Sequence, residues 1–461
     1  MKTLPTTSTP ISIAALRAAL KGQVITPDDV GYDEARTVFY GGIDRRPALI
    51  VRVANDADVA YVVSLARDTG LELAVRSGGH SVVGHSVTDG GIVLDLHDMR
   101  ALDIDTERRT AWAETGLTAG ELTTAAGAHG LAIGFGDTGS VGIGGITLGG
   151  GVGYLSRKYG LTIDSLLAAD IVTADGQLVR VDAETHPDLF WAIRGGGGNF
   201  GVVTRFQYRL HEVGTVVGGM LILPATPDTI AGFMAEAEAA PDEFSAIANI
   251  MPAPPMPFVP AEYHGKLIIM AIMVYAGDVA EGQRVVAPFK ALATPIADMV
   301  RPMPYPEIYP PDDSNYHPTA VSRTMFIDTV DRSVADLIVD RLRTSSAQMA
   351  AAQLRVLGGA IARVPVDATA YAHRKSKIMV NVAAMFGPTE DSARHQAWVT
   401  DFAAALHQSD DGAYVNFLTS EGEAEIHAAY PGATYERLAA IKGRYDPTDL
   451  FRLNQNIQPA R

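Results

Sequence analysis

Glycine is concentrated in three segments of the N-terminal half, and these segments limit what the chain can fold into. They span residues 75–86, 137–160 and 188–204 and read VRSGGHSVVGHS, DTGSVGIGGITLGGGVGYLSRKYG and DLFWAIRGGGGNFGVVT. Glycine at this density indicates backbone that passes close to a ligand or to other backbone, where no side chain fits. Core-type residues interrupt the second segment, namely Ile146, Leu148, Val152 and Leu155. It is therefore no simple linker, and two such loops in one domain favour a cofactor site.

The first segment ends an apolar strand in Arg76-Ser77-Gly78-Gly79-His80. Its paired glycines expose backbone amides beside a serine hydroxyl and an arginine, which together form a cradle for a phosphate or pyrophosphate. A histidine at the edge of that cradle would face the ligand. A tight glycine turn with a solvent-exposed histidine explains the same residues equally well.

The third segment contains Gly196, Gly198 and Gly201 in the spacing of a dinucleotide-binding fingerprint. The run before them, DLFWAIR, reads as a helix where the fingerprint requires a strand. No acidic residue follows at the required distance, so a nicotinamide site of the Rossmann type is disfavoured.

The length of 461 residues predicts two domains, because one hydrophobic core rarely grows so large. Between about residues 47 and 210, short β-branched runs alternate with helical stretches, whereas residues 214–410 carry proline clusters followed by alanine-rich helices. We expect an α+β protein with a mixed α/β domain over residues 1–213 (core 42–213). A second domain over residues 214–410 would hold an antiparallel sheet covered by helices, and residues 411–461 would pack back on the first.

Charge and composition exclude several classes of function. The net charge of −16 argues against nucleic acid and anionic membranes as partners. The absence of cysteine excludes disulfides, thiolate metal sites and cysteine nucleophiles, and the histidines show no metal-ligand spacing. The N-terminus lacks the pattern of a secretory signal, so we expect a cytoplasmic protein. The most apolar run, Leu267–Ala276, is too short to span a bilayer and reads as a buried strand.

Five ordered segments together resemble the berberine-bridge-enzyme-like group of the vanillyl-alcohol-oxidase/p-cresol-methylhydroxylase flavoprotein superfamily. They are VRSGGHSVVGHS, GGITLGGGVGYLSRKYGL, DLFWAIRGGGGNFGVVT, GGAIARVPVDATAYAHR and YERLAAIKGRYDPTDLFRLNQNIQP. The resemblance implies FAD bonded through its 8α-methyl group to His80, with the hydride chemistry supplied by the flavin. The further cofactor-binding residues that it implies are Arg76, Ser77, Gly78, Gly79, Ser81, His85, Ser86, Thr138, Gly139, Gly142, Gly145, Thr147, Gly150, Gly201, Val202, Asn454 and Asn456.

The segment Thr138-Gly139-Ser140-Val141-Gly142 departs from many members of this group. Those members bond the flavin a second time through a cysteine in a Cys-Pro-x-Val-Gly segment. A chain without cysteine has at most the single link through His80, and Thr138 would offer a hydroxyl near the ring edge instead. The space left over the flavin would suit a bulkier substrate or an unusual oxygen adduct.

The candidate catalytic residues are Gln353, Arg355, Tyr414 and Asn416. Members of the group commonly read Tyr-x-Asn-Tyr in a strand near the end of the chain, with a tyrosine as general base, whereas this chain has Phe417 in place of the second tyrosine. In such a strand Tyr414 and Asn416 share one face, so either Tyr414 is the base or the base lies elsewhere. Gln353 and Arg355 share a face of another strand, where arginine could orient an anionic or enolic substrate or stabilise an oxyanion. An exposed strand arginine in a solvated ion pair is the alternative.

These features predict an FAD-dependent oxidase that takes hydride from a small alcohol, sugar or secondary-metabolite intermediate and reduces O2 to H2O2. Three alternatives stay open: a dehydrogenase shielded from oxygen, an oxygenase or oxidative cyclase of secondary metabolism, and a flavin-binding protein that has lost catalysis. The sequence indicates neither the substrate nor the oligomeric state.

Overall fold

The N-terminal half begins with a small sheet in the computed structural model, which describes residues 12–311, 313, 315–387, 389–419 and 422–460. The four strands lie in the order β1-β2-β4-β3, with bounds β1 (Gln23–Ile25), β2 (Leu49–Arg52), β3 (Leu73–Arg76) and β4 (Ile92–Asp95). Strands β2, β4 and β3 run parallel. Helices α1 (Ile13–Ala19), α2 (Tyr32–Arg36) and α3 (Asp56–Thr69) accompany them.

Helix α3 shows why this part of the sequence folds as it does. The Asn55 side chain accepts a hydrogen bond from the Asp58 backbone amide at the start of the helix, and Gly70 ends it at φ 70°. Its apolar residues fall at helical spacing on one face, namely Val59, Val62, Val63 and Ala66. That face is buried with the apolar residues of β2 and β4.

A second, antiparallel sheet of five strands follows in the order β5-β6-β10-β8-β9. Its strands are β5 (Leu102–Asp105), β6 (Thr110–Glu114), β8 (Leu166–Val172), β9 (Leu178–Asp182) and β10 (Val202–Arg209). Short helices lie between these strands, some of them in the glycine-rich segments: α4 (Ala119–Gly127), α5 (Ile143–Leu148), α6 (Ser156–Tyr159), η1 (Thr162–Ser165) and α7 (Pro187–Ala192). A two-stranded ribbon joins β7 (Leu131–Ala132) to β11 (His211–Glu212). Most of the run DLFWAIR, residues 188–192, is helical in α7, as predicted.

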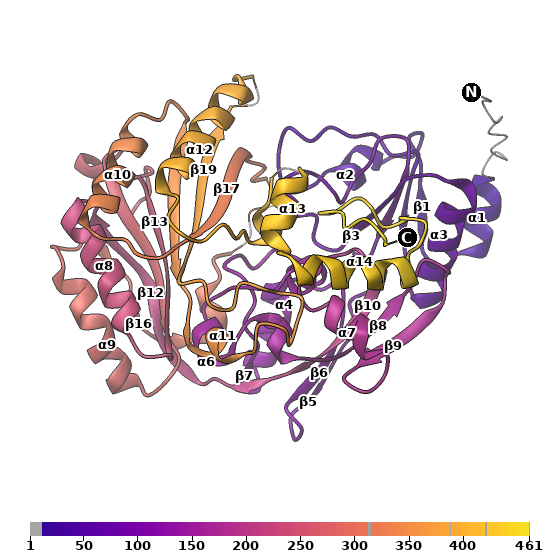
Figure 1. Ribbon diagram of the computed structural model, residues 1–461, viewed down its shortest axis with the longest axis horizontal. Coiled ribbons are helices and arrows are strands. Elements are labelled where there is room, and N and C mark those ends of the chain that lie inside the picture. Colours follow the sequence, from indigo (N-terminus) through magenta and orange to yellow (C-terminus); the bar gives the residue numbers. More distant parts are fainter. Residues whose placement is uncertain (1–11, 312, 314, 388, 420–421, 461) are drawn as a thin grey trace.

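The middle of the chain forms one large antiparallel sheet, which lies beside the N-terminal half in Figure 1. Its path is β15-β12-β14-β13-β18-β19-β17, and β16 pairs with β12. The strands are β12 (Thr215–Pro224), β13 (Phe244–Pro252), β14 (Leu267–Tyr275), β15 (Ala297–Asp298), β16 (Arg301–Pro304), β17 (Thr319–Ile327), β18 (Met349–Val356) and β19 (Ile378–Phe386). The predicted buried strand at Leu267–Ala276 is confirmed as β14, which lies between β12 and β13.

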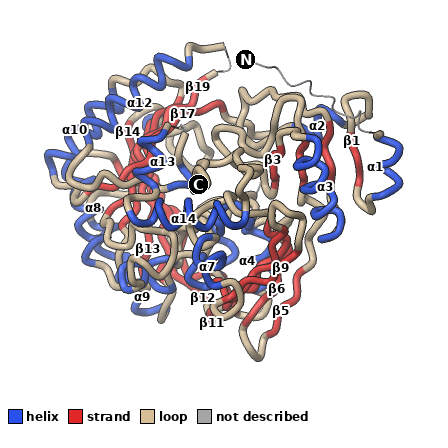
Figure 2. The backbone as a smooth tube through the Cα atoms, turned by 45° about the vertical axis from the view of Figure 1, so that its right-hand side comes forward, coloured by secondary structure: helices blue, strands red, loops and turns tan. Residues whose placement is uncertain are grey.

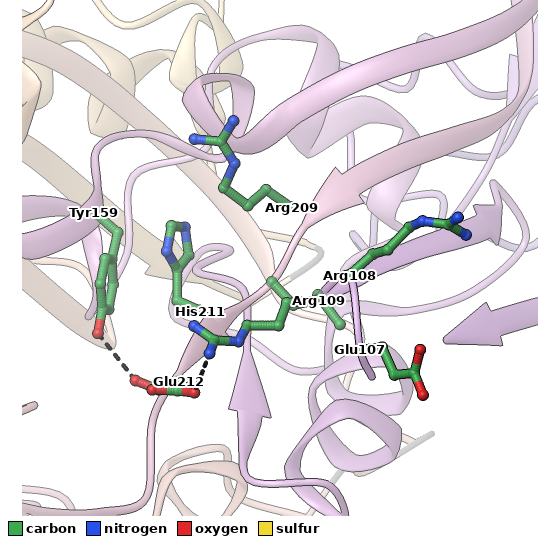
Figure 3. A pocket seen from close by; sticks show the side chains of 8 residues that line it. Glu107, Arg108, Arg109, Tyr159, Arg209, His211 and Glu212 are labelled. Atoms are coloured by element: carbon green, nitrogen blue, oxygen red, sulfur yellow. Dashed lines mark hydrogen bonds and ion pairs between the residues drawn. The ribbon is translucent and has the colours of Figure 1, made fainter. Parts of the chain in front are cut away.

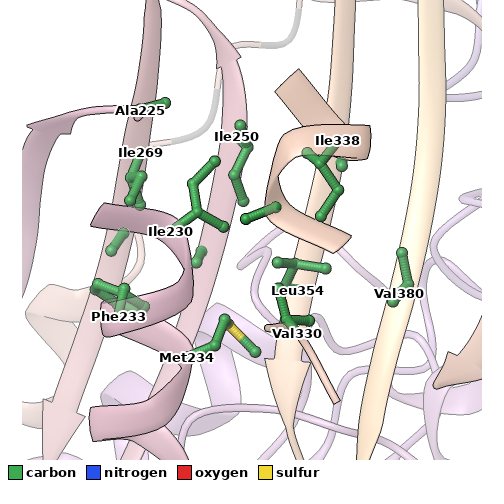
Figure 4. Packing of buried hydrophobic residues seen from close by; sticks show 14 of the residues in the cluster. Ala225, Ile230, Phe233, Met234, Ile250, Ile269, Val330, Ile338, Leu354 and Val380 are labelled. Atoms are coloured by element: carbon green, nitrogen blue, oxygen red, sulfur yellow. The ribbon is translucent and has the colours of Figure 1, made fainter. Parts of the chain in front are cut away.

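Helices cover the outer face of this sheet, as the blue segments of Figure 2 show. They are α8 (Pro227–Ala239), α9 (Val279–Ala291), α10 (Arg332–Arg343) and α12 (Ser392–Leu406). Figure 4 shows Ile230, Phe233 and Met234 of α8 packed against strand residues that include Ile250, Ile269 and Leu354. Each fully buried apolar side chain contributes roughly 1.5–3 kcal/mol. The opposite face of the sheet is thereby left for the N-terminal half. The short elements η2 (Ala261–Tyr263), η3 (Tyr305–Ile308) and α11 (Gly359–Arg363) lie in the connecting loops.

The C-terminal segment packs on the N-terminal half through η4 (Val415–Phe417), α13 (Glu423–Ala429) and α14 (Ala433–Tyr445). Figure 1 shows α13 and α14, in yellow, lying across that half. Leu438 and Ile441 of α14 are buried in the same cluster as Leu189 of α7. The predicted α+β class with an antiparallel second sheet is confirmed. None of the helices in the described part of the chain has the length and apolarity needed to cross a membrane.

Candidate active site

A cavity of about 560 Å³ lies where the glycine-rich loops of the N-terminal half meet the uncovered face of the large sheet. Its walls come from the loop after β3, the segment before and within α5, the loop before β10, strands β13, β17, β18 and β19, and the C-terminal segment. This volume falls in the range usual for cofactor and substrate sites. All three glycine-rich segments therefore meet in one place.

Two of these loops touch through their backbones. A Cβ on Gly142 would lie 2.2 Å from the Gly78 amide nitrogen and 2.3 Å from Ser77 Oγ, so no side chain fits between the loops. Ser77 Oγ donates to the Thr115 carbonyl oxygen at 2.6 Å and accepts from the Gly144 amide at 3.2 Å, which fixes their relative position. Gly145 lines the cavity and differs from Gly142, because a Cβ there meets nothing within 4 Å. Glycine at position 145 therefore keeps space open in the cavity, whereas glycine at position 142 allows two backbones to touch.

His80 lines the cavity on the loop after β3. Its ring stacks on Phe39 with 4.0 Å between centroids and 19° between planes, so the imidazole is held in a defined orientation. Arg76, expected in the phosphate cradle, does not line the cavity. Its Nη2 donates to Asp95 Oδ2 at 2.7 Å and to the Ala35 carbonyl oxygen at 2.6 Å, because the end of β3 directs this side chain toward β4 and α2. Arg76 therefore stabilises the loop through contacts outside the cavity.

The other residues expected to bind the cofactor fall into two groups. Those that line the cavity with His80 are Ser77, Gly78, Gly79, Ser81, His85, Ser86, Thr138, Gly142, Gly145, Gly201, Val202 and Asn454. Those that do not are Arg76, Gly139, Thr147, Gly150 and Asn456. Thr147 Oγ1 is hydrogen-bonded to the buried Tyr208 hydroxyl at 2.7 Å, and Asn456 Nδ2 donates to Asp449 Oδ2 at 2.9 Å. Gly150 packs against Tyr371 and Tyr414, and Gly139 against Gly120 and Tyr309. These residues support the walls.

The wall formed by the large sheet consists of rows set by strand register. Asn249, Gln353 and Asn381 are paired neighbours on β13, β18 and β19 and form a polar row. The next row is small, with Ala351, Ala383 and Ser322 paired across β18, β19 and β17. All six side chains line the cavity, while the residues between them on β18 and β19 are buried under the helices. The wall thus has a row of polar amide side chains beside a row of small side chains.

Arg355 joins the sheet to the loop that precedes α5. Its Nη2 donates to Asp137 Oδ2 at 2.6 Å, its Nη1 to the Val152 carbonyl oxygen at 3.0 Å and its Nε to Gln353 Oε1 at 3.1 Å. Gln353 Nε2 in turn donates to Asn249 Oδ1 at 2.9 Å. The Arg355 side chain is only 4% exposed, so the alternative of a solvated strand arginine is wrong. Gln353 and Arg355 do share a face, as the alternation predicted.

The segment Tyr414–Phe417 is not the strand that the sequence suggested. Residues 415–417 form the single turn η4, in which four consecutive residues can all line the cavity. The Tyr414 hydroxyl oxygen accepts from the Gly151 amide and from Asn416 Nδ2, both at 2.9 Å. Burial raises the pKa of Tyr414, so it stays a phenol at neutral pH and is a poor base. Phe417, whose ring centre is 5.2 Å from the Arg355 guanidinium carbon, has no proton to exchange.

The cavity also presents polar atoms that suit a large polar ligand such as FAD. Five buried oxygens that belong to lining residues have no hydrogen-bond partner within the described residues: Ser86 Oγ, Asn381 Oδ1, the Tyr430 hydroxyl, Asn454 Oδ1 and Gln455 Oε1. Buried polar groups usually find partners, so a ligand with its own donors fits here. The residues present therefore fit the cofactor that the glycine loops suggest.

A second cavity lies on the surface near the β11 ribbon and shares no lining residue with the first. Figure 3 shows its charged side chains, in which Arg109 pairs with Glu212 at 2.6 Å and the Tyr159 hydroxyl donates to the Glu212 carbonyl oxygen. Burial, together with Arg209 and Lys158, lowers the pKa of His211 to about 4, so this histidine is neutral at pH 7. Across the described ranges no cluster of histidine and acidic side chains could hold a metal ion.

Comparison with known proteins agrees with this arrangement. The FAD binding domain family matches residues 47–182, and the family described as berberine and berberine like matches residues 413–458. (R)-6-hydroxynicotine oxidase of Paenarthrobacter nicotinovorans is 32% identical over 470 residues, which cover 98% of each chain. The chain belongs to the berberine-bridge-enzyme-like family of FAD-linked oxidoreductases.

Other members and solved structures support this membership. An FAD-linked oxidoreductase of Dictyostelium discoideum is 31% identical over 90% of this chain and 89% of its own. The crystal structure of 6-hydroxy-D-nicotine oxidase from Arthrobacter nicotinovorans matches with a TM-score of 0.85 at 28% identity, covering 96% of this chain and 98% of that one. Xylooligosaccharide oxidase from Myceliophthora thermophila, at 24% identity and a TM-score of 0.84, shares the fold over 97% of this chain and 99% of its own. The predicted class of enzyme, an FAD oxidoreductase of the berberine-bridge-like family, is confirmed.

Sequence reasoning missed several residues that line the cavity: Phe39, Tyr40, Asp137, Asn249, Tyr316, Asn381, Tyr430 and Gln455. Asn249 and Asn381 each interrupt a strongly apolar strand, a signal that was available in the sequence. Asp137 directly precedes Thr138 and was equally visible. Phe39 and Tyr40 belong to a loop with no motif, and only the fold brings them to His80.

Proposed function

We propose that this protein is an oxidase in which FAD is bonded through a single link to His80 and transfers electrons from a small organic substrate to O2, forming H2O2. The observation that carries the proposal is the position of His80. It lies on the same cavity as the Ser77–Gly78 cradle, and the polar row of β13, β18 and β19 forms another wall of that cavity. A flavin bonded to His80 would therefore have the large sheet on its substrate side.

FAD would accept a hydride from the substrate and pass the electron pair to oxygen. The protein would hold the cofactor and the substrate in position and provide polar contacts to both. The contact between Gly78 and Gly142 holds two loops together, so that their amides can face the pyrophosphate. Gln353 and Asn249 hold each other through a hydrogen bond, and this fixes the polar row against which a substrate is oriented.

The named activities of two relatives support a proposal for the substrate class. (R)-6-hydroxynicotine oxidase and xylooligosaccharide oxidase carry the names of small organic substrates with O–H or amine groups. We therefore propose an alcohol, a sugar or a secondary-metabolite intermediate as substrate, with O2 as the acceptor.

The first experiment asks whether flavin stays with acid-denatured protein. We expect yellow flavin in the pellet of the wild type and of His129→Ala, and none in the pellet of His80→Ala. His129→Ala is the control for loss of a histidine because His129 is exposed and does not line the cavity. Release of flavin from the wild type would refute the covalent link. Anaerobic bleaching by a substrate panel that includes (R)-6-hydroxynicotine and xylobiose, followed by H2O2 detection in air, then tests the oxidase reaction.

A further inference from the structure

We propose that Asp137 receives the reacting hydroxyl or uncharged amine of the substrate: it selects such donors over carboxylates and takes their proton as the substrate is oxidised. This inference rests on the proposed function. Because position 417 is phenylalanine and not the tyrosine common in relatives, the general base of the reaction has to be another residue, and we assign that role to Asp137. Nothing in the resemblance to known flavoproteins assigns a role to this residue.

The charge of the cavity is the first argument. Among the described residues that line it, Asp137 is the only carboxylate and Arg355 the only guanidinium. They form an ion pair with 2.6 Å between Nη2 and Oδ2, so the pair adds almost no net charge to the substrate side. An anionic substrate would find no unbalanced positive charge there.

Arg355 is also occupied in its hydrogen bonding. Its Nε, Nη1 and Nη2 donate to Gln353, to the Val152 carbonyl oxygen and to Asp137 respectively. A guanidinium has five N–H donors in a fixed fork, and here every nitrogen already points at a protein acceptor. The interpretation of Arg355 as an anion-binding residue is therefore disfavoured, and its effect is to hold Asp137.

Asp137, in contrast, keeps acceptor capacity toward the cavity. Oδ2 takes the strong bond from Arg355 and a longer one from Gln353 Nε2 at 3.4 Å, whereas among the residues that the structure describes Oδ1 accepts only from the Thr138 hydroxyl at 3.3 Å. Its side chain is 26% exposed although Arg355 beneath it is buried. A carboxylate with a free lone pair beside the polar row is suited to accept a hydrogen bond from O–H or N–H.

The aromatic hydroxyls of the cavity do not compete for this role. Burial and the charge of Asp137 raise the pKa of Tyr40 to about 12, and burial raises the pKa of Tyr316, Tyr414 and Tyr430. All four therefore remain protonated at neutral pH and act as donors or acceptors of hydrogen bonds. In the proposed function His80 is bonded to the flavin, so it does not serve as the base.

The step balances as a two-electron oxidation. The substrate loses a hydride from carbon to the cofactor and a proton from oxygen or nitrogen to Asp137 Oδ1, and a C=O or C=N double bond forms. The proton leaves Asp137 for water when product departs. The small row of Ala351, Ala383 and Ser322 adjoins the polar row, so a flat apolar body can lie along it while the donor reaches Asp137.

The test uses the flavin-loaded protein and two compounds of similar size, benzyl alcohol and benzoate, with the flavin absorbance as readout. We expect benzyl alcohol to perturb the wild-type spectrum and benzoate to bind about tenfold more weakly or worse, because benzoate has no proton to donate to Asp137 Oδ1 and places two acceptors against each other. In Asp137→Asn the charge of Arg355 is unbalanced, so benzoate should become the tighter ligand. Asp137→Glu should keep the preference of the wild type, and Asp103→Asn, an exposed acid on β5, controls for net charge.

Three results would overturn the proposal: equal binding of both compounds to the wild type, no change of preference in Asp137→Asn, or no spectral response to either compound. A failed covalent link would show separately, since it is scored on the denatured pellet before either compound is added. With whichever compound of the substrate panel bleaches the flavin, Asp137→Asn should slow bleaching by about 10²-fold or more while Asp137→Glu restores part of the rate. Bleaching of Asp137→Asn at the wild-type rate would remove the proton-accepting role.

Discussion

Arg355 Nη2 and Asp137 Oδ2 lie 2.6 Å apart although 218 residues separate them in the sequence. One belongs to β18 of the large sheet and the other to the loop before α5, so this ion pair fastens the two halves of the molecule at the candidate active site.

Replacing Arg355 with Met should destabilise the protein by about 2 kcal/mol, because it leaves Asp137 without its counter-charge. We expect less than for a fully buried pair, since the carboxylate is 26% exposed and can be hydrated from the cavity. Urea unfolding followed by circular dichroism measures the change. The double variant Arg355→Met/Asp137→Asn should recover part of the loss, and strict additivity of the two single changes would contradict a direct interaction.

Gly142→Ala and Gly145→Ala should separate packing within the protein from approach of the cofactor. A Cβ at 142 meets the Gly78 amide at 2.2 Å, so this change should cost about 1–3 kcal/mol of stability before any flavin binds. A Cβ at 145 meets nothing in the protein, and alanine in α5 should raise stability by up to about 1 kcal/mol. We expect Gly145→Ala instead to lower the flavin content of the purified protein. Equal thermal unfolding of both variants would contradict this division.

Tyr414→Phe removes the oxygen that accepts two hydrogen bonds, from Gly151 and from Asn416. The buried Gly151 amide is then left without its acceptor, while Asn416 Nδ2 keeps its bond to the Ile146 carbonyl oxygen, so unfolding by urea at neutral pH should show a loss of about 1–3 kcal/mol.

The alkaline side of the stability profile gives a second measurement on Tyr414. Because burial raises its pKa in the folded state, Tyr414 contributes stability that is complete below the tyrosine pKa of the unfolded chain and is lost as pH rises through the higher folded value. Above about pH 10 the decline of stability with pH should therefore be shallower in Tyr414→Phe, by about 1.4 kcal/mol per pH unit. An identical decline in both proteins would show that Tyr414 is already accessible to solvent when folded.

Lys442→Met should be among the most damaging single changes in the C-terminal segment. Lys442 Nζ is fully buried and contacts Asp449 at 2.7 Å and Asp446 at 3.5 Å. Its removal leaves the buried Asp446 uncompensated, for which we expect a loss of about 3–5 kcal/mol near pH 7. Calorimetric unfolding with and without added FAD would measure it, and Lys442→Arg is the matched variant that keeps the charge.

The same variant should respond to acid in a defined direction. Burial raises the pKa of Asp446 above its unfolded value, so its contribution to stability falls as pH rises through that interval. Without Lys442 we expect the folded-state pKa of Asp446 to rise further, so the pH range over which Asp446 loses stability extends to higher pH. The difference in stability between Lys442→Met and the wild type should therefore shrink on going from about pH 7 to about pH 4.5, and a constant difference would contradict the ionic interaction.

The glycine-rich loops and the family signature could be predicted from sequence because their signals are local. Close backbone approach requires glycine at Gly78 and Gly142 whatever the rest of the chain does, and an apolar run such as β14 leaves little choice but burial. The proposal of FAD, and the return of the last helices to the first domain, followed from such segments.

The substrate wall was harder to predict because its geometry depends on register and on distant partners. Arg355 was identified as a candidate, but its partner Asp137 lies 218 positions earlier, in the loop before α5, and no sequence pattern pairs the two. Asn249 and Asn381 become neighbours of Gln353 only through the pairing of β13, β18 and β19. The turn at Val415–Phe417 was taken for a strand because three residues carry too little periodicity to distinguish the two.

The burial of Lys442 beneath the C-terminal segment bears on when the cofactor can enter. Its Nζ donates to the Phe451 carbonyl oxygen and to Asn456 Oδ1, and it thereby positions Asn454 and Gln455, which line the cavity. That wall cannot form on a ribosome that still holds the segment after α14 in its exit tunnel. Enclosure of the proposed flavin therefore has to wait until this segment has emerged, and chains interrupted before residue 449 should hold less flavin than the intact chain.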